Sequence, residues 1–207
     1  MTKITERGMI FNGEMVRAIL DGRKTQTRRP IKWKQTRFTE IGEHEDGSKW
    51  PWSEDSEHAC DFWHPCPFGA VGDRIWVREA FRVHSRATDV ATLVYKASER
   101  NSWTEQTRRV PVAVCNKPAT PEKWTPSLHM PRWASRILLE ITGVRVERLR
   151  SMSQDDARAE GVIAASGPME AGLAFRELWD SIYGEESWKA NPWVWVIEFK
   201  RVEGGAA

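Results

Sequence analysis

The order of strand-like and helix-like segments is the feature that most constrains how this chain can fold. Clusters of β-branched and aromatic residues predict strands at 74–78, 92–96, 109–115, 136–148 and 192–201. Capping residues and stop glycines predict helices at 13–22, 153–161 and 168–183. Because helices and strands do not alternate, the pattern argues against a doubly wound parallel sheet. It predicts an α+β fold in which a mostly antiparallel, partly closed β-barrel carries a few packed helices.

The length of 207 residues is suited to one domain with a core of its own. Residues 31–70 are polar and lack a helical or strand period. They also contain chain breakers at Gly42, Gly47, Pro51, Pro65 and Pro67. We therefore expect a single domain over 1–207, with a long irregular insertion at about 31–70 and a flexible tail at 203–207.

Charge is unevenly distributed along the chain. The formal net charge of +2 excludes a globally basic mode of nucleic-acid binding but leaves room for a local basic patch. Residues 1–37 hold ten lysines and arginines against three acids, whereas residues 38–62 hold eight acids against one lysine. A basic segment is thus followed directly by an acidic one.

The three cysteines, Cys60, Cys66 and Cys115, are too few and too scattered for the disulfide framework of a small secreted domain. No stretch approaches the ~18–20 apolar residues that a membrane span requires. These features predict a soluble, cytoplasmic protein that does not contact a membrane.

Four residues of the types that bind zinc occur close together, at His58, Cys60, His64 and Cys66. Their spacing lacks the paired arrangement of zinc ribbons and fingers. The segments between these residues are also too short to place four ligands readily in a tetrahedron around one zinc ion. They are weak metal candidates, and we favour a loop that holds no metal.

The segment from Gly22 to Arg29 is the best candidate for chemistry. Lys24 is crowded by Arg23, Arg28 and Arg29, and like charge lowers the pKa of a lysine, as does burial. Lys24 is therefore a candidate base, and Thr27 a candidate nucleophile if the backbone turns between them. The alternative is a basic turn whose arginines contact phosphates without chemistry.

The spacing Gly22-x-Lys24-x-x-Thr27-x-Arg29 resembles the G-x-K-x-x-[ET]-x-R signature of the ASCH domain, a member of the PUA-like superfamily of small β-barrels. Three further stretches are similar to that family: 72–78, 157–161 and 195–199. The resemblance covers about residues 9–202 and is closest to the longer ASCH proteins of bacteriophages and prophages. It implies recognition of RNA or of modified nucleosides, in the cytoplasm of a bacterial host if the chain is phage-encoded.

Small bacterial ASCH proteins include amidohydrolases that remove the acetyl group of N(4)-acetylcytidine with a lysine, a threonine and a glutamate. The resemblance places these roles on Lys24, Thr27 and Glu160, without a cofactor. Lys24 would take a proton from Thr27 or water, and Glu160 would handle the proton that the leaving amine needs. A glutamate in the last turn of a surface helix is otherwise commonplace.

A nucleobase is usually held by stacking on aromatic rings and by polar groups along its edge. We expect Trp76 and Trp133 to supply rings and Arg78, His129 and Arg132 to supply polar contacts. Core packing is the alternative for both indoles, and the stronger one for Trp76.

Three other functions stay open. The first is a divalent-metal-dependent ribonuclease acting on single-stranded RNA, the second a non-catalytic reader of RNA or of a modified base, and the third a phage structural or anti-host protein on the same fold. The expected partner is a modified nucleoside or a single-stranded nucleic acid, and the sequence predicts no oligomeric state.

Overall fold

The computed structural model describes residues 4–32, 40–55, 60–163 and 170–202. The chain divides into two compact units, each assembled from segments far apart in the sequence. Unit 1 contains Met1–Gly22, Arg74–Glu140 and Arg201–Ala207, and unit 2 contains Arg23–Asp73 and Ile141–Lys200. The single domain expected from the length stays a prediction, and the tail at 203–207 lies outside the described residues.

Unit 1 is built from two groups of strands. Strand β1 (Glu6–Ile10) pairs in parallel with β6 (Arg74–Arg78), and β6 pairs antiparallel with the start of β10 (Leu138–Arg148). An antiparallel sheet has the order β7 (Phe81–Arg86), β8 (Val90–Tyr95) and β9 (Thr107–Pro111). The helical elements are α1 (Gly13–Leu20), α2 (Trp103–Gln106) and the 3₁₀ turns Lys96–Ser98, Ser127–His129 and Arg132–Ala134.

The core of unit 1 lies between β7, β8 and the turn at 132–134. Phe81, Leu93 and Tyr95 are fully buried there. A buried ion pair borders this core, because Arg136 donates to both carboxylate oxygens of Glu79 at 2.8 and 3.0 Å. The Arg136 guanidinium also lies 4.1 Å from the centroid of the Tyr95 ring.

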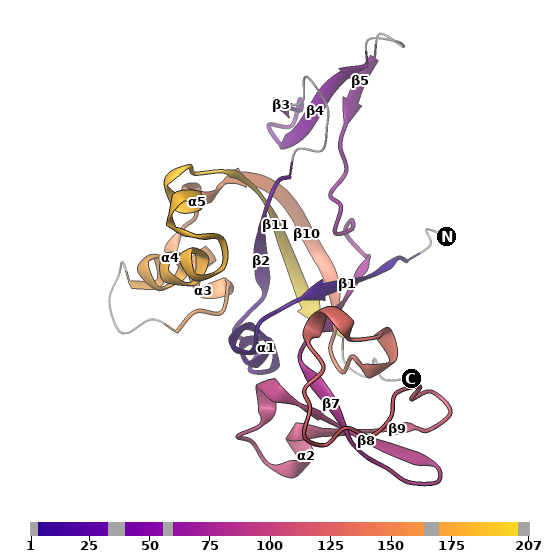
Figure 1. The fold of residues 1–207 in the computed structure, drawn as a ribbon. Helices are drawn as coiled ribbons and strands as arrows, with labels where there is room; N and C mark the ends of the chain where they lie inside the picture. The colour runs from indigo at the N-terminus through magenta and orange to yellow at the C-terminus, as the bar shows by residue number, and fades with distance from the viewer. Residues whose placement is uncertain (1–3, 33–39, 56–59, 164–169, 203–207) are drawn as a thin grey trace. The chain divides into compact units, whose positions relative to one another are not determined.

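In unit 2 the continuation of β10 lies beside β11 (Trp193–Arg201), and β11 pairs antiparallel with β2 (Gln26–Pro30) (Figure 1). The helices α3 (Gln154–Ala159), α4 (Glu170–Tyr183) and α5 (Glu185–Lys189) and the 3₁₀ turn Leu149–Ser151 follow β10. Phe175 and Trp179 of α4 pack with Val194 and Val196 of β11 in the core of this unit. None of the described helices is long and apolar enough to cross a membrane.

The α+β class expected from the sequence is confirmed, and most strand pairs are antiparallel. The described strands form three sheets, and their closure into a barrel stays a prediction. The strand expected at 109–115 ends instead at Pro111. Proline has no backbone N–H to continue the ladder, and Cys115 N donates to Pro111 O at 3.1 Å in a turn.

The expectation of an irregular insertion at 31–70 is wrong. This stretch contains a sheet of β3 (Glu40–Glu43), β4 (Lys49–Asp55) and β5 (Cys60–Trp63), in that order. Pro51 suggested a break, yet it lies in the central strand opposite Ile41, and its carbonyl accepts a hydrogen bond from His64 N at 2.8 Å. We call this three-stranded unit the inserted sheet.

Gly42 is the residue that lets the inserted sheet pack. A Cβ at this position would lie 2.8 Å from the ring of Trp63 and 3.1 Å from Cβ of Trp52. Trp52 and Trp63 are cross-strand partners between β4 and β5. Gly42 therefore does not break the strand. The Trp52 and Trp63 side chains can pack at this position because Gly42 has no Cβ.

We predict that Gly42→Ala destabilises the inserted sheet by about 1–3 kcal/mol, because the added methyl group must displace the Trp63 ring. Urea unfolding and limited proteolysis between residues 40 and 63 would measure this effect. Gly13→Ala is the matched control, since its Cβ would meet only ordinary contacts of 3.5 Å or more. Equal stability of the two variants would contradict the role given to Gly42.

Candidate functional site

The contact between Lys24 and Glu160 is the centre of the candidate site. Lys24 Nζ donates to Glu160 Oε2 at 2.8 Å and to Glu160 O at 2.9 Å. The Lys24 side chain is fully buried, and that of Glu160 is 2% exposed. Backbone pairing aligns the two segments, because Thr25 N donates to Ala159 O and Phe199 N donates to Thr25 O, both at 2.8 Å. The segment before β2 is thereby fixed between the end of α3 and strand β11.

Arg28 holds the other oxygen of the same carboxylate. Its guanidinium is fully buried and donates to Glu160 Oε1 at 3.3 Å. The second nitrogen of Arg28 lies 3.3 Å from Glu147 Oε2 and 3.4 Å from Asp156 Oδ1. Each oxygen of Glu160 therefore faces its own cation, which a buried carboxylate needs in order to stay charged.

Arg145 extends these contacts toward solvent. It donates to Glu147 Oε1 at 2.6 Å and to Asp156 Oδ1 at 3.0 Å, and it also contacts Glu198. We call the resulting cluster the ion network. Its members are three cations and four carboxylates: Lys24, Arg28, Arg145, Glu147, Asp156, Glu160 and Glu198.

Burial and neighbouring groups shift the pKa values of three members of the network, Lys24, Asp156 and Arg145. Burial is the largest influence on Lys24 and lowers the pKa of its ammonium group. The charge and hydrogen bond of Glu160 raise that pKa, and the nearby arginines lower it, so that it ends below the usual value. For Asp156, burial raises the pKa. Hydrogen bonds from Ser153 and Gln26 and the charge of Arg28 together lower it by more, so the pKa of this carboxylate lies below its usual value.

The basic segment is a strand and not the turn expected from the sequence, since Gln26–Pro30 form β2. Lys24 lies before the regular strand, whereas Thr27 lies within it, opposite Ile197, with 1% exposure. Arg23 donates to Gly161 O at 2.6 Å, and Arg29 donates to the Tyr183 hydroxyl at 3.4 Å.

The expected base-contacting residues all belong to unit 1. Trp76 is half-buried, and its ring packs on Gly8, where a Cβ would come within 2.5 Å of it. The guanidinium of Arg78 lies 5.4 Å from the Trp76 ring centroid and donates to carbonyls of the turn at 127–129. The close approach to Gly8 gives the Trp76 ring a packing role.

The other three residues lie on the segment 129–133. His129 is exposed, and Arg132 donates to Glu6 Oε2 at 2.8 Å. Trp133 packs edge-on against Phe81 at the border of the unit 1 core. Of the two interpretations open for Trp133, the structure supports core packing.

The weak metal candidates are spread over different environments. Cys60 is exposed, Cys66 is buried, and His64 Nε2 lies 2.9 Å from the Ser53 hydroxyl. His58 falls outside the described residues. Within the part of the chain that the structure describes, no three histidine, cysteine, aspartate or glutamate side chains are grouped so as to hold a metal.

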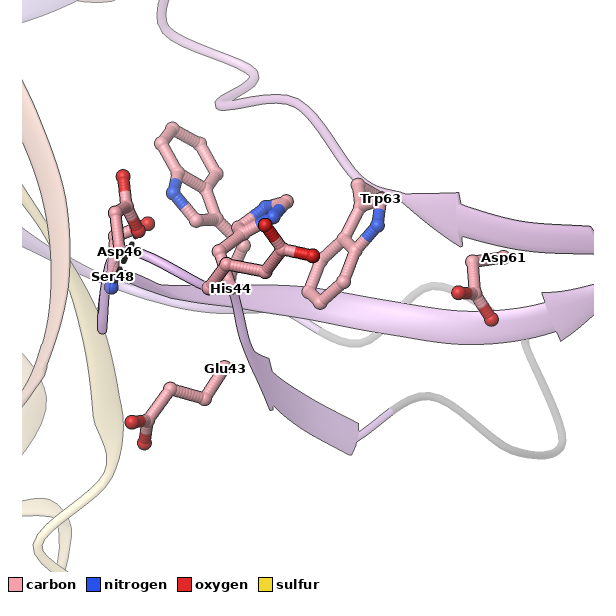
Figure 2. Close-up of a pocket in the computed structure, with 8 residues that line it drawn as sticks. Glu43, His44, Asp46, Ser48, Asp61 and Trp63 are labelled. Atoms are coloured by element: carbon pink, nitrogen blue, oxygen red, sulfur yellow. Dashed lines mark hydrogen bonds between the residues drawn. The ribbon is translucent and has the colours of Figure 1, made fainter.

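Two pockets lie in unit 2 next to the inserted sheet. The first, about 630 Å³, is lined by Glu43, His44, Glu45, Asp46, Ser48, Trp50, Asp61 and Trp63. Figure 2 shows His44 beside Trp63, and their ring centroids are 3.8 Å apart in a stacked arrangement. We call it the acidic pocket, because four carboxylates give it a negative field that disfavours phosphate.

The second pocket, about 590 Å³, has a different character. It is lined by residues 46–50 of the inserted sheet, 144–148 of β10, Ser151 and Trp193. Lys49, Arg145 and Arg148 supply cations, and Trp50 and Trp193 supply rings. We call it the basic-aromatic pocket. Because Arg145 and Glu147 line it, the ion network reaches solvent here.

Comparisons with known proteins give a partial likeness. No protein-family model matches the chain, and no curated protein matches it. One similar solved structure is titled "High resolution crystal structure of ASCH domain from Lactobacillus crispatus JV V101". It shares 12% identity and a TM-score of 0.42 with this chain, over 95% of this chain and 79% of the other.

Sequence reasoning missed the outer members of the ion network. Arg145 and Glu147 are two residues apart in a predicted strand, so their side chains share one face. That charged pair was a usable signal. Asp156 also forms the capping box of α3 through its hydrogen bonds with Ser153.

We predict that Glu160→Gln lowers the free energy of unfolding by about 3–5 kcal/mol, because the amide leaves the buried Lys24 ammonium without its anion and removes one of the three carboxylates around Arg28. Asp155→Asn is the matched control on the same helix. Its carboxylate is 92% exposed and pairs only with Arg158 among the described contacts, so its loss should cost less than about 1 kcal/mol. Urea unfolding measures both, and similar costs would contradict the central place of Glu160.

The depressed pKa of Asp156 predicts a pH-dependent stability. Its carboxylate stabilises the fold above the ordinary pKa of 3.8, and this contribution is lost as the pH falls below that value. Asp156→Asn should therefore be less stable than the parent protein at neutral pH, with a smaller difference at about pH 3. Urea midpoints at both pH values test this, and a difference that grows in acid would refute it.

Proposed function

We propose that this chain is an ASCH-type protein that binds a modified nucleoside or a single-stranded nucleic acid and hydrolyses an N-acyl cytosine derivative. One observation carries the proposal. Lys24 and Glu160, 136 positions apart in the sequence, are in direct contact and buried, and the pKa of Lys24 is lowered. A lysine with a lowered pKa beside a carboxylate is suited to proton transfer.

The chemistry follows from these two groups. Lys24 takes a proton from water, and the resulting hydroxide attacks the acyl carbonyl. Thr27 lies in strand β2 next to Arg28, so its side chain faces away from Glu160 and it is not the nucleophile. The bond between the carbonyl carbon and N4 breaks, and the proton held by Lys24 passes through Glu160, to which it is hydrogen-bonded, to N4. The products are the free cytosine amine and a carboxylate, with one water consumed overall. We assign Arg28 to positioning Glu160, because its guanidinium already contacts the acid.

The basic-aromatic pocket supports access of a nucleobase to this chemistry. Indole rings stack on bases, and cations attract the phosphates attached to them. The pocket meets the ion network at Arg145 and Glu147, and Glu147 contacts Arg28. The buried position of Lys24 then requires the contact between Arg145 and Glu147 to open when substrate binds.

We predict that the purified protein releases acetate from N(4)-acetylcytidine without added metal, and that Lys24→Met lowers the rate at least about 100-fold by removing the base. Acetate release is measured by coupled assay at neutral pH. Lys189→Met is the matched control, since this exposed lysine of α5 pairs only with Glu185 and Glu186 among the described contacts and should keep the parent rate. Circular dichroism checks that both variants fold.

Full activity of folded Lys24→Met would overturn the assignment of the base. Cleavage of single-stranded RNA that needs a divalent ion would favour a ribonuclease instead. Salt-sensitive binding of oligonucleotides without any turnover would identify a reader of nucleic acid.

A further inference from the structure

We infer that the basic-aromatic pocket is a second subsite that binds the phosphate and base of a nucleotide next to the reacting one. The preferred substrate would then be an N-acyl cytosine within a single strand, and the free nucleoside would be turned over without using this pocket. This inference rests on the proposed function. It is carried by two exposed cations, Lys49 and Arg148, which both lie near the Trp193 ring in a pocket that also contains Trp50 and borders the ion network.

The cations are arranged for a phosphate. The Arg148 guanidinium lies 4.3 Å from the centroid of the Trp193 ring, and Lys49 Nζ lies 5.9 Å from the same centroid. Arg148 also donates to Asn191 O at 3.1 Å, which fixes the guanidinium over the ring. The Lys49 side chain is 46% exposed. Its one ion pair among the described residues is a long contact of 4.0 Å with Glu43, so its ammonium is accessible to a ligand. A phosphate between them would gain two charge-assisted contacts.

The acids of the pocket do not cancel this field. Glu147 already contacts Arg28 and Arg145, so its charge is compensated within the ion network. Asp46 accepts a hydrogen bond from Ser48 N at 2.8 Å and lies on the side shared with the acidic pocket. A phosphate is therefore repelled from the Asp46 side of the pocket and attracted to the Arg148 side.

Trp50 provides the surface for the neighbouring base. It comes from the inserted sheet, is half-buried, and its ring centroid is 5.4 Å from that of buried Trp195 at 59°. This contact holds the indole in place before a ligand binds, so little rotamer freedom is lost on stacking. Aromatic rings stack on any base, which suits a subsite for a flanking nucleotide of variable identity.

The subsite is next to the proposed chemistry through residues that belong to both. Arg145 and Glu147 line the pocket and are members of the ion network. Glu147 contacts Arg28, which contacts Glu160, so three consecutive ion contacts lead from the pocket to Lys24. A nucleotide in the pocket would thus flank a base that enters toward Lys24.

The test compares Lys49→Ala/Arg148→Ala with a control, Arg158→Ala/Lys189→Ala, that removes two exposed cations elsewhere in unit 2. The probe is a fluorescein-labelled single-stranded oligocytidine of about ten nucleotides, followed by anisotropy across a salt series. We expect the Kd to rise at least about tenfold for the pocket variant. The slope of log affinity against log salt should fall by about 0.7 for the one phosphate that is no longer neutralised, and the control should match the parent protein.

Acetate release then separates this inference from the proposed function. Turnover of an N(4)-acetylcytidine oligonucleotide should fall in the pocket variant, whereas turnover of the free nucleoside should not. Unchanged affinity and salt slope, or an equal loss with both substrates, would overturn the subsite. Absence of turnover with any substrate in the parent protein would overturn the proposed hydrolysis, while the anisotropy series would still decide the subsite.

Discussion

The buried carboxylate of Glu160 is the constraint on which unit 2 depends. A charge removed from water is tolerated only when cations and hydrogen bonds replace its hydration. Lys24 and Arg28 meet that requirement from one short stretch of chain, one on each oxygen. The need to compensate this charge thus holds the start of β2 against the end of α3, and backbone hydrogen bonds of Thr25 continue the attachment to β11.

The ion network also explains how a nearly neutral chain can present distinct local fields. Part of the positive charge of residues 23–29 is neutralised by ion pairs inside unit 2, because Arg28 is fully buried among three carboxylates. The acids of the inserted sheet instead face a pocket of their own, and the cations Lys49 and Arg148 border the neighbouring one. Net charge alone therefore says little about which surface of this protein attracts an anion.

Sequence patterns predicted the parts of the fold where local preference and burial agree. Alternation of large apolar residues marked β11, and Ser153 with Asp156 marked the start of α3. The inserted sheet escaped prediction because Gly42 and Pro51 act against strand preference and are offset by the packing of Trp52 and Trp63, which only the tertiary structure shows. The motif likewise identified Lys24 and Glu160 as candidates. Their burial and their ion contacts through Arg145 and Glu147 depend on tertiary structure and could not be predicted from the motif.

The interleaving of the two units has a consequence for the order of folding during synthesis. Lys24 leaves the ribosome long before Glu160, and strand β2 is made long before its partner β11. Until the last strand emerges, the lysine and its neighbouring arginines are solvated, and β2 has an open edge. Contacts of such sequence separation are entropically costly to close, so we expect unit 2 to form late and cooperatively, after β11 has been translated.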